Sequence, residues 1–469
     1  MGFFNLCCRS GGSNLNAGTR KGDTTIPGTS ASFTYTSGVW VNATRTFTVA
    51  SGNPSTDGIV AGDYAAIDTG GSIAAFIARV TSVTGTTIVL DATDILGSNP
   101  ANGTYTLRIG GAWQGPSGSS GWPFTQAFGN FGTGASSTIV RLNLKNVANF
   151  SITAVIGQGS AGPAHVWGFT NTYGDGGIAT INGGTSGASY NLLTTGLSGA
   201  TQLYKCLEFK NNGATGNANG VAPGNFSVTF ENCVFRDLRG NGFITGGSNC
   251  GVNLINCEIY NCNQSNSATT AGVNNNGGWL RMYLCSVHDN VTRGVMCSGA
   301  TSIVKCIIES NGAEGIYYNH TYGSTIIACD IYNNATNGIS IFAGQAMIMN
   351  NRIFKNGTTG SHYGINFVGA NVFIRSNTFG TGTQANNGGN FNSSNNANDE
   401  NSTNYSSNLT PWIDPANGNF GTNPDAEDVG TGFETFLTTA SGRTQTTGYV
   451  DRGASQHQES DAGGAMFFH

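Results

Sequence analysis

Two aspartates occupy the same place in a repeating sequence pattern, and paired carboxylates are the groups that cleave glycosidic bonds. Asp237 and Asp289 each stand four residues after a cysteine. If these repeats are stacked two coils apart, the two backbones lie about 10 Å apart, just beyond the ~6.5–9.5 Å carboxyl separation of inverting glycosidases. Because Asn261 and Asn333 fill the same position in other repeats, the position is typical of a turn. We therefore predict no catalytic residue and keep Asp237 and Asp289 as weak candidates, should the chain be an enzyme.

Cysteine is the second residue type that could do chemistry. Nine of the eleven cysteines lie between residues 206 and 329. A metal site would need closely paired cysteines or recurring histidines, and the repeats contain neither. We predict buried free thiols that pack against one another, with no metal and no cofactor. The predicted structural ladder comprises Cys233, Cys257, Cys285, Cys306, Cys329, Asn351 and Asn377.

The elements that position these residues are short strands of an internal repeat. Each repeat has alternating apolar residues, then the ladder residue, then an apolar residue two positions later, and successive ladder residues are 21 to 28 positions apart. A glycine followed by an apolar residue recurs with a similar period, as in Gly294-Val295 and Gly315-Ile316. Two registers with one period predict a solenoid of stacked coils.

The repeated elements N-C-x-[IVF]-x-[ND] and G-[IVF], clear over residues 200–380, resemble the right-handed parallel β-helix superfamily, the pectate-lyase-like proteins. A weaker alternating segment, Val140–Val155, extends the pattern. Ser10–Thr19 and Pro411–Phe420 resemble the superfamily's opening and closing segments, and Gly448–Gln456 resembles a final docking strand. The resemblance implies an all-β chain whose body is a right-handed parallel β-helix.

Many members of this superfamily cleave polysaccharides, so the resemblance implies which motifs to look for. The pectin-hydrolase motifs Asn-Thr-Asp, Asp-Asp, Gly-His-Gly and Arg-Ile-Lys are absent, and Arg352–Lys355 only approximates the last of them. The calcium-binding aspartate cluster of the lyases is also absent from the repeats. We therefore predict that the chain is not an enzyme.

A different pattern precedes the repeats. Period-two alternation on either side of a Thr84-Gly85-Thr86 turn predicts a small β-barrel or sandwich. The predicted domains are an N-terminal segment at 1–28, this β domain at 29–112, a Gly/Ser-rich connection at 113–138, the parallel β-helix at 139–380, and a polar loop with a C-terminal cap or docking strand at 381–469.

Composition limits the class of partner. The chain has 469 residues, only 20 of them Lys or Arg, and a net charge of −5, which is not the electrostatic footprint of a nucleic-acid binder. No run of 18 apolar residues predicts a membrane span, and Met1–Cys8 lacks the features of a signal peptide. We expect synthesis in a host cytoplasm, with neither nucleic acid nor membrane as a partner.

A small β domain joined to a β-helix resembles bacteriophage head and tail structural proteins. We predict a non-enzymatic virion protein, a capsid decoration or appendage on the virion surface, attached through its N-terminal region. Its expected partners are capsid or other virion proteins and further copies of itself, a trimer being one arrangement, with a host glycan as a candidate ligand. Two alternatives stay open: a tailspike-type polysaccharide depolymerase or glycan-binding protein, and a bacterial surface adhesin with an extracellular or cell-surface location.

Overall fold

The computed structural model describes most of the chain and divides it into two compact units, residues 1–253 and 254–469. The described residues are 3–9, 33–70, 76–97, 100–110, 113–114, 139–146, 149–159, 164–196, 202–224, 227–247, 250–357, 362–367, 371–375, 377–380, 391–393, 397–400, 403–405, 412–414 and 419–422. Every regular element among them is a β-strand. No helix of membrane-spanning length and hydrophobicity occurs in these ranges.

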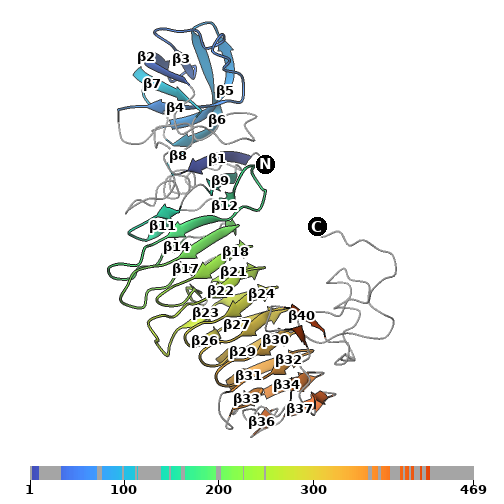
Figure 1. The fold of residues 1–469 in the computed structure, drawn as a ribbon. Coiled ribbons are helices and arrows are strands. Elements are labelled where there is room, and N and C mark those ends of the chain that lie inside the picture. The colour runs from blue at the N-terminus through green and yellow to red at the C-terminus, as the bar shows by residue number, and fades with distance from the viewer. Residues whose placement is uncertain are drawn as a thin grey trace, which may run out of the picture. The chain divides into compact units, whose positions relative to one another are not determined.

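A six-stranded barrel forms from residues 33–109 in the first unit (Figure 1). Its strands alternate inward and outward side chains, and Trp40 and Phe47 are fully buried in the core with Ile88 and Leu107. The barrel order is β2-β3-β6-β5-β4-β7, with β2 (Phe33–Val41), β3 (Thr46–Thr48), β4 (Tyr64–Asp68), β5 (Phe76–Thr84), β6 (Thr87–Gly97) and β7 (Gly103–Ile109). This confirms the predicted small β domain, of the two expected forms the barrel, with its hairpin turn between β5 and β6.

The remaining strands of the first unit stack in parallel as three sheets. Sheet 1 contains β11 (Ile156–Gly159), β14 (Leu193–Gly196), β17 (Val221–Pro223) and β20 (Phe243–Ile244). Sheet 2 contains β8 (Trp113–Gln114), β1 (Phe3–Arg9), β9 (Ile139–Lys145), β12 (Ala164–Phe169), β15 (Gln202–Lys205) and β18 (Ser227–Glu231). Sheet 3 contains β10 (Phe150–Ser151), β13 (Ala179–Asn182), β16 (Leu207–Lys210) and β19 (Val234–Arg236).

The first strand of the chain belongs to the solenoid and not to a separate N-terminal segment. β1 pairs in parallel with β9 on one side and with β8 on the other. The barrel is therefore looped out of the chain between β1 and β8. The predicted N-terminal segment at 1–28 contains this strand, and the sequence does not reveal its pairing because Phe3–Arg9 carries no ladder residue and stands far in sequence from its partners.

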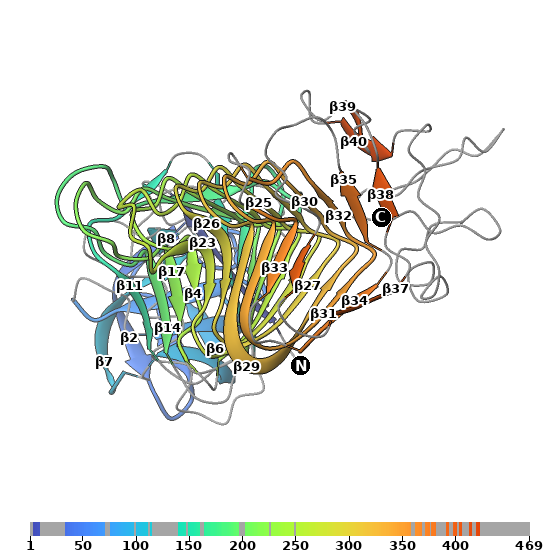
Figure 2. The ribbon, with the colours of Figure 1, turned by 90° about the horizontal axis from the view of Figure 1, so that it is seen from below.

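The second unit is likewise built of coils with three sheets, and Figure 2 shows these sheets as the sides of each coil. Strand β21 (Gly251–Ile255) spans the division between the units, and the strands that follow it repeat in the order sheet 3, sheet 1, sheet 2. Sheet 1 holds β23 (Ala271–Asn275), β26 (Arg293–Cys297), the first part of β29 (Ile316–Ile327), the first part of β31 (Ile339–Met349), β33 (Ile365–Phe367) and β36 (Phe391–Ser393). Sheet 2 holds β24 (Trp279–Tyr283), β27 (Ala300–Val304), the second parts of β29 and β31, β34 (Asn371–Arg375) and β37 (Ala397–Glu400). Sheet 3 holds β22 (Glu258–Tyr260), β25 (Ser286–His288), β28 (Ile307–Glu309), β30 (Asp330–Tyr332), β32 (Arg352–Phe354), β35 (Thr378–Gly380) and β38 (Thr403–Tyr405).

Two left-handed residues per coil bend the chain on either side of each sheet 3 strand. One stands just before the ladder residue and the other four positions after it. The first set is Asn232, Asn256, Leu284, Lys305, Ala328 and Asn350, with φ between 50° and 56°; the second is Asp237, Asn261, Asp289, Ser310, Asn333 and Lys355, with φ between 50° and 57°. Asparagine and aspartate tolerate this backbone best, which explains why Asn is frequent in the repeats.

The recurring glycines have a different cause. Gly315 precedes a sheet 1 strand and has no positive φ, but a Cβ there would lie 2.7 Å from Asn334 Nδ2 and 2.8 Å from Gly338 O. Gly294 and Gly338 meet the same obstruction in their own coils. Glycine therefore recurs because the next coil leaves no room for a side chain, and not because the backbone there needs an unusual conformation.

The solenoid also extends past residue 380, where a polar loop is predicted. Strands β36, β37 and β38 lie within residues 391–405 and extend all three sheets. Their sequences have few apolar residues, so the alternation that predicts the earlier coils is absent, although parallel pairing needs only backbone groups. β39 (Trp412–Asp414) and β40 (Asn419–Thr422) form a small antiparallel pair. The proposed opening and docking segments, 10–19 and 448–456, lie outside the described residues.

Candidate functional site

The ladder cysteines stack one per coil at the start of the sheet 3 strands. Cys233, Cys257, Cys285, Cys306 and Cys329 are all buried, and none of them forms a disulfide. Cys285 Sγ donates to Leu254 O at 3.3 Å and to Tyr283 O at 3.5 Å. Cys329 Sγ contacts Ile303 O and Ile327 O at 3.6 and 3.3 Å.

The Cys306 thiol of the ladder is held in its protonated form. Burial raises the pKa of the Cys306 thiol, and hydrogen bonds with Cys285 and Cys329 raise it further. The thiol of Cys297, on sheet 1, has its pKa raised to about 12 by burial. A protonated and inaccessible thiol is a poor nucleophile and a poor metal ligand. Among the described residues, no group of three or more His, Cys, Asp or Glu could hold a metal ion.

Asparagine takes over the ladder where cysteine stops. Asn351 Nδ2 donates to Ile326 O at 3.0 Å and to Asn377 Oδ1 at 2.9 Å, while Asn351 Oδ1 accepts from Cys329 N at 2.9 Å. A second column of buried asparagines, here called the amide ladder, stands five positions after the ladder residues. It comprises Asn290, Asn311, Asn334 and Asn356, each bonded to the next through Nδ2 and Oδ1 at 2.9 Å.

Asp237 is neutralised within an ionic network of the first unit. Its carboxylate bonds Arg236, whose Nε also contacts Glu208 Oε1 at 2.6 Å. Glu208 accepts from Thr180 Oγ1 at 2.7 Å and faces Lys210 Nζ at 3.5 Å. Burial alone would raise the pKa of Glu208, but the bonds from Thr180 and Arg236 hold it below its usual value. The Glu208 carboxylate therefore stays ionised and paired, which makes it a poor proton donor.

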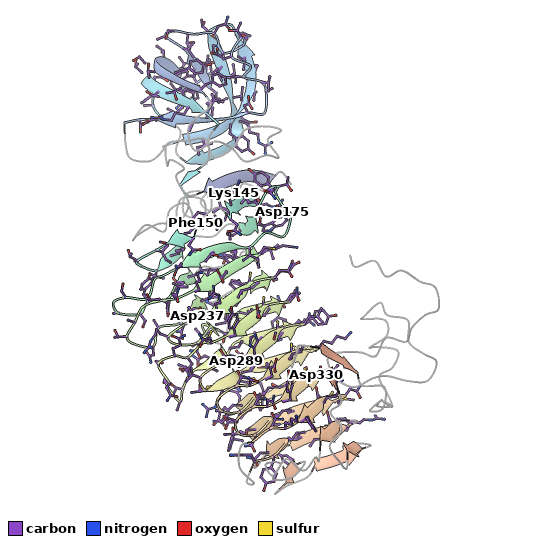
Figure 3. The ribbon with its side chains drawn as sticks, viewed as in Figure 1. Lys145, Phe150, Asp175, Asp237, Asp289 and Asp330 are labelled. Carbon is purple, nitrogen blue, oxygen red and sulfur yellow. The ribbon has the colours of Figure 1, made fainter. Side chains whose placement is uncertain are left out.

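Asp289 lies in the second unit with partners of its own (Figure 3). Its Oδ2 is 2.9 Å from His288 Nδ1, and His288 Nε2 is 3.2 Å from Glu258 Oε1. The His288 ring also stacks on Tyr260, with centroids 5.0 Å apart. The carboxylates are open to solvent, with side-chain exposures of 64% for Asp289 and 48% for Glu258. The structure thus gives Asp237 and Asp289 separate partners and brings a histidine to the second of them.

The next coil adds a carboxyl group whose pKa is raised. Glu309 stands on β28, and burial raises its pKa, although the hydrogen bond from Tyr332 and the nearby His288 oppose the rise. Burial also raises the pKa of the Tyr332 hydroxyl, and its hydrogen bond to Glu309 raises that pKa further. A carboxyl group whose pKa is raised beside a histidine is suited to donate a proton.

A buried ion pair lies on the strands next to Glu309. Arg352 on β32 contacts Asp330 on β30 through Nε at 2.7 Å and Nη2 at 2.9 Å, and both side chains are almost fully buried, at 1% and 0% exposed. Fork-shaped pairing of this kind fixes both side chains. We call Glu258, His288, Asp289, Glu309 and Tyr332 the acid–base cluster.

Three residues of the acid–base cluster share the same position relative to the ladder. His288, Glu309 and Tyr332 each stand three residues after a ladder cysteine and pair directly across β25, β28 and β30. Alignment of the repeats at this third position shows a column of Tyr, His, Glu and Tyr in the sequence. The sequence interpretation considered only the fourth position and therefore missed Glu309.

Aromatic side chains also gather on sheet 1. Arg293 lies over the Tyr317 ring, 4.1 Å from its centroid, and pairs with Glu314 Oε2 at 3.0 Å. Phe342 packs against Tyr317 with centroids 5.2 Å apart. Elsewhere, Asp175 faintly resembles a calcium-binding aspartate in sequence, but its carboxylate accepts four backbone N–H groups from residues 170–172 and 177, which hold its pKa well below the usual range.

Comparison with known proteins supports the fold. Residues 195–346 match the model of a family described as a right-handed β-helix region, which confirms the predicted right-handed parallel β-helix. No curated protein matches the chain. Similar solved structures include pectate lyase Pel9A, 17% identical with a TM-score of 0.41 over 70% of this chain and 85% of that one.

Two virus proteins are also similar in structure. ORF18 of Geobacillus virus E2 is 13% identical with a TM-score of 0.40, over 60% of this chain and 56% of that one. The tailspike gp61 of Pseudomonas phage phi297 is 13% identical with a TM-score of 0.30, over 75% of this chain and 57% of that one. At these values the similarity concerns the fold alone.

Proposed function

We propose that this chain, which carries a right-handed parallel β-helix of the pectate-lyase-like superfamily, is a structural component of a bacteriophage particle, a decoration or appendage attached through its N-terminal region. The observation that carries the proposal is the barrel looped out between β1 and β8. Because β1 already belongs to the solenoid, the barrel is tethered at both ends to the first strands of the coil stack. A module held in this way is suited to attach a stiff shaft to a particle.

The interior of the solenoid supports a load-resisting role. Each coil bonds to the next through its backbone, and the cysteine and amide ladders add side-chain bonds along the same direction. Buried amides with all their partners in place rigidify a core. The Arg236–Glu208 ion pair likewise joins neighbouring coils, so charged groups of the first unit also serve cohesion.

Mass spectrometry of purified particles from the virus or prophage that encodes this chain tests the proposal. We expect the chain in the particles at a fixed copy number. Trp40→Ala, which removes a fully buried barrel side chain, should abolish incorporation while the solenoid stays folded. Val39→Ala, on the exposed side of the same strand, should be incorporated normally. Particles that lack the chain, or that take up both variants equally, would refute the attachment role.

The acid–base cluster favours a second candidate, a tailspike-type polysaccharide depolymerase with Glu309 as proton donor. The supporting observation is the register that places Glu309 directly between His288 and Tyr332 on neighbouring strands, where burial raises the pKa of its carboxyl group. Incubation of the pure chain with capsular or cell-wall polysaccharide of the host, followed by assay of new reducing ends, tests this candidate. Release of oligosaccharides that is lost in Glu309→Gln supports an enzyme, and no release from any host polysaccharide contradicts it.

A further inference from the structure

The outer surface of sheet 3 passes from open to buried along the second unit. Its outward side chains stand one and three positions after each ladder residue. On β22, Glu258 is exposed, and the outward side chains of β25 and β28 are half-buried. On β30 and β32 the exposed fraction falls to 0% for Asp330, 2% for Tyr332, 1% for Arg352 and 3% for Phe354. Neighbouring strands shield only the flanks of an outward side chain, so values this low require another part of the chain to lie over it.

The covered surface has its charges paired and is partly apolar. Arg352 donates to Asp330 through Nε at 2.7 Å and Nη2 at 2.9 Å, which pairs the two buried charges. Tyr332 and Phe354 pack with Ile307 into one apolar cluster. Because an unpaired buried charge costs far more than a paired one, this pairing makes the surface fit to be covered. A segment that packs here therefore needs apolar side chains to match the cluster.

The segment that reaches this surface is the hairpin β39–β40. The chain leaves sheet 3 at Tyr405, the end of β38, and β39 begins at Trp412. The seven residue steps between them span at most about 25 Å, whereas β30 lies three strand spacings, about 14 Å, from β38. Both views of the second unit place β40 beside sheet 3 near β30 and β32 (Figures 1 and 2). The hairpin sequence supplies the apolar residues Trp412, Ile413 and Phe420.

We propose that the hairpin β39–β40 is a displaceable cover over β30 and β32, which closes the Tyr332 side of the acid–base cluster. The hairpin pairs with no other strand that the structure describes, so its departure breaks side-chain contacts but no hydrogen bond between coils. A two-stranded hairpin is marginally stable by itself, and such an element opens far more readily than the coil stack. The control of polysaccharide access to Glu309 rests on the depolymerase candidate, whereas the contact itself does not.

Chymotrypsin digestion of the full-length chain, followed by mass spectrometry, tests the inference, because this protease cuts after Tyr405, Trp412 and Phe420. The wild type should be cut there at least about tenfold more slowly than a synthetic peptide of residues 403–425. Phe354→Asp places a charge under the cover and should speed this cleavage about tenfold or more. Tyr260→Asp is the matched control, because Tyr260 is a half-buried aromatic residue at the same coil position on β22; it should be cut like the wild type.

Thermal unfolding establishes that each variant is folded, and Phe354→Ala replaces Phe354→Asp if the latter is not. A wild-type chain cut as fast as the peptide would overturn the inference, as would a folded Phe354 variant cut no faster than the wild type or a Tyr260→Asp control cut equally fast. The digestion needs no polysaccharide, so a failed depolymerase assay leaves the cover standing. Where a polysaccharide is cleaved, faster release of reducing ends by Phe354→Asp supports the control of access, and equal rates refute it.

Discussion

Distance from the ladder decides what each residue of a sheet 3 strand does. The residue two after the ladder, such as Val287 or Ile308, points inward and is fully buried. The residue three after it points outward, and the residue four after it bends the chain with a positive φ. Chemistry can therefore occupy only the outward positions, where His288 and Glu309 meet on neighbouring coils.

If the chain cleaves polysaccharides, cleavage depends on the carboxyl group of Glu309. Because burial raises its pKa, it keeps its proton above pH ~4.3, where an exposed glutamate loses it. Cleavage that uses this proton should fall as pH rises through the raised pKa. We expect Glu309→Gln to lower the rate of reducing-end release by about 100- to 10,000-fold. The control Asp237→Asn should cleave normally, and equal loss in both variants would contradict the assignment.

The free energy of unfolding should also change as Glu309 titrates. A carboxyl group with a raised folded pKa binds more protons in the folded state than in the unfolded state, so its contribution to stability declines as pH rises from ~4.3 through the raised pKa. In Glu309→Gln this decline should disappear. Thermal unfolding of both proteins between pH 4 and pH 8 would measure the difference, and parallel curves would show that Glu309 titrates normally.

Between neighbouring strands, the amide ladder is the feature that joins coils through side chains. Asn334 Nδ2 donates to Ile308 O, Tyr332 O and Asn356 Oδ1 at 3.2, 3.1 and 2.9 Å, and Asn334 Oδ1 accepts from both nitrogens of Asn311. Replacement by leucine leaves several buried polar groups unpaired, each at a cost of about 1–3 kcal/mol. We expect Asn334→Leu to lower the free energy of unfolding by about 3 kcal/mol or more.

The adjacent asparagine supplies the control. Asn333 is exposed and adopts a φ of 55°, which glycine adopts without strain. Asn333→Gly should therefore change the free energy of unfolding by less than about 1 kcal/mol. Denaturant unfolding of both variants measures the contrast. If Asn333→Gly cost as much as Asn334→Leu, the amide ladder would not be the source of the cohesion between coils.

The sequence predicts the coils where apolar residues alternate and fails where they do not. The ladder positions from Cys233 to Asn377 are visible because a buried column restricts residue type in every coil. β36 to β38 escape notice because their sequences lack alternating apolar residues. β1 escapes because its partners on β9 lie 136 positions away in the sequence, and a parallel pairing over that distance leaves no local signal. The acid–base cluster escapes because outward positions tolerate many residue types, so only spatial proximity reveals it.

At the scale of the whole chain, the barrel and the solenoid have separate cores. The described barrel core consists of residues between 35 and 109 only, including Trp40, Ile67 and Leu107. The solenoid core is made by the stacked columns. A domain with its own core can unfold by itself. Two unfolding transitions are therefore expected, one for each part.

Trp40→Ala separates these transitions. Removal of a fully buried tryptophan, whose Nε1 also donates to Pro100 O at 3.1 Å, should cost the barrel about 3–5 kcal/mol. We expect calorimetry to show the barrel transition at a lower temperature and the solenoid transition unchanged, because Trp40 belongs to the barrel core. Limited proteolysis should then cut within residues 33–110 and leave the stacked coils intact. A single transition that moves as a whole would mean that barrel and solenoid fold as one cooperative body, and that the barrel is not an independent attachment module.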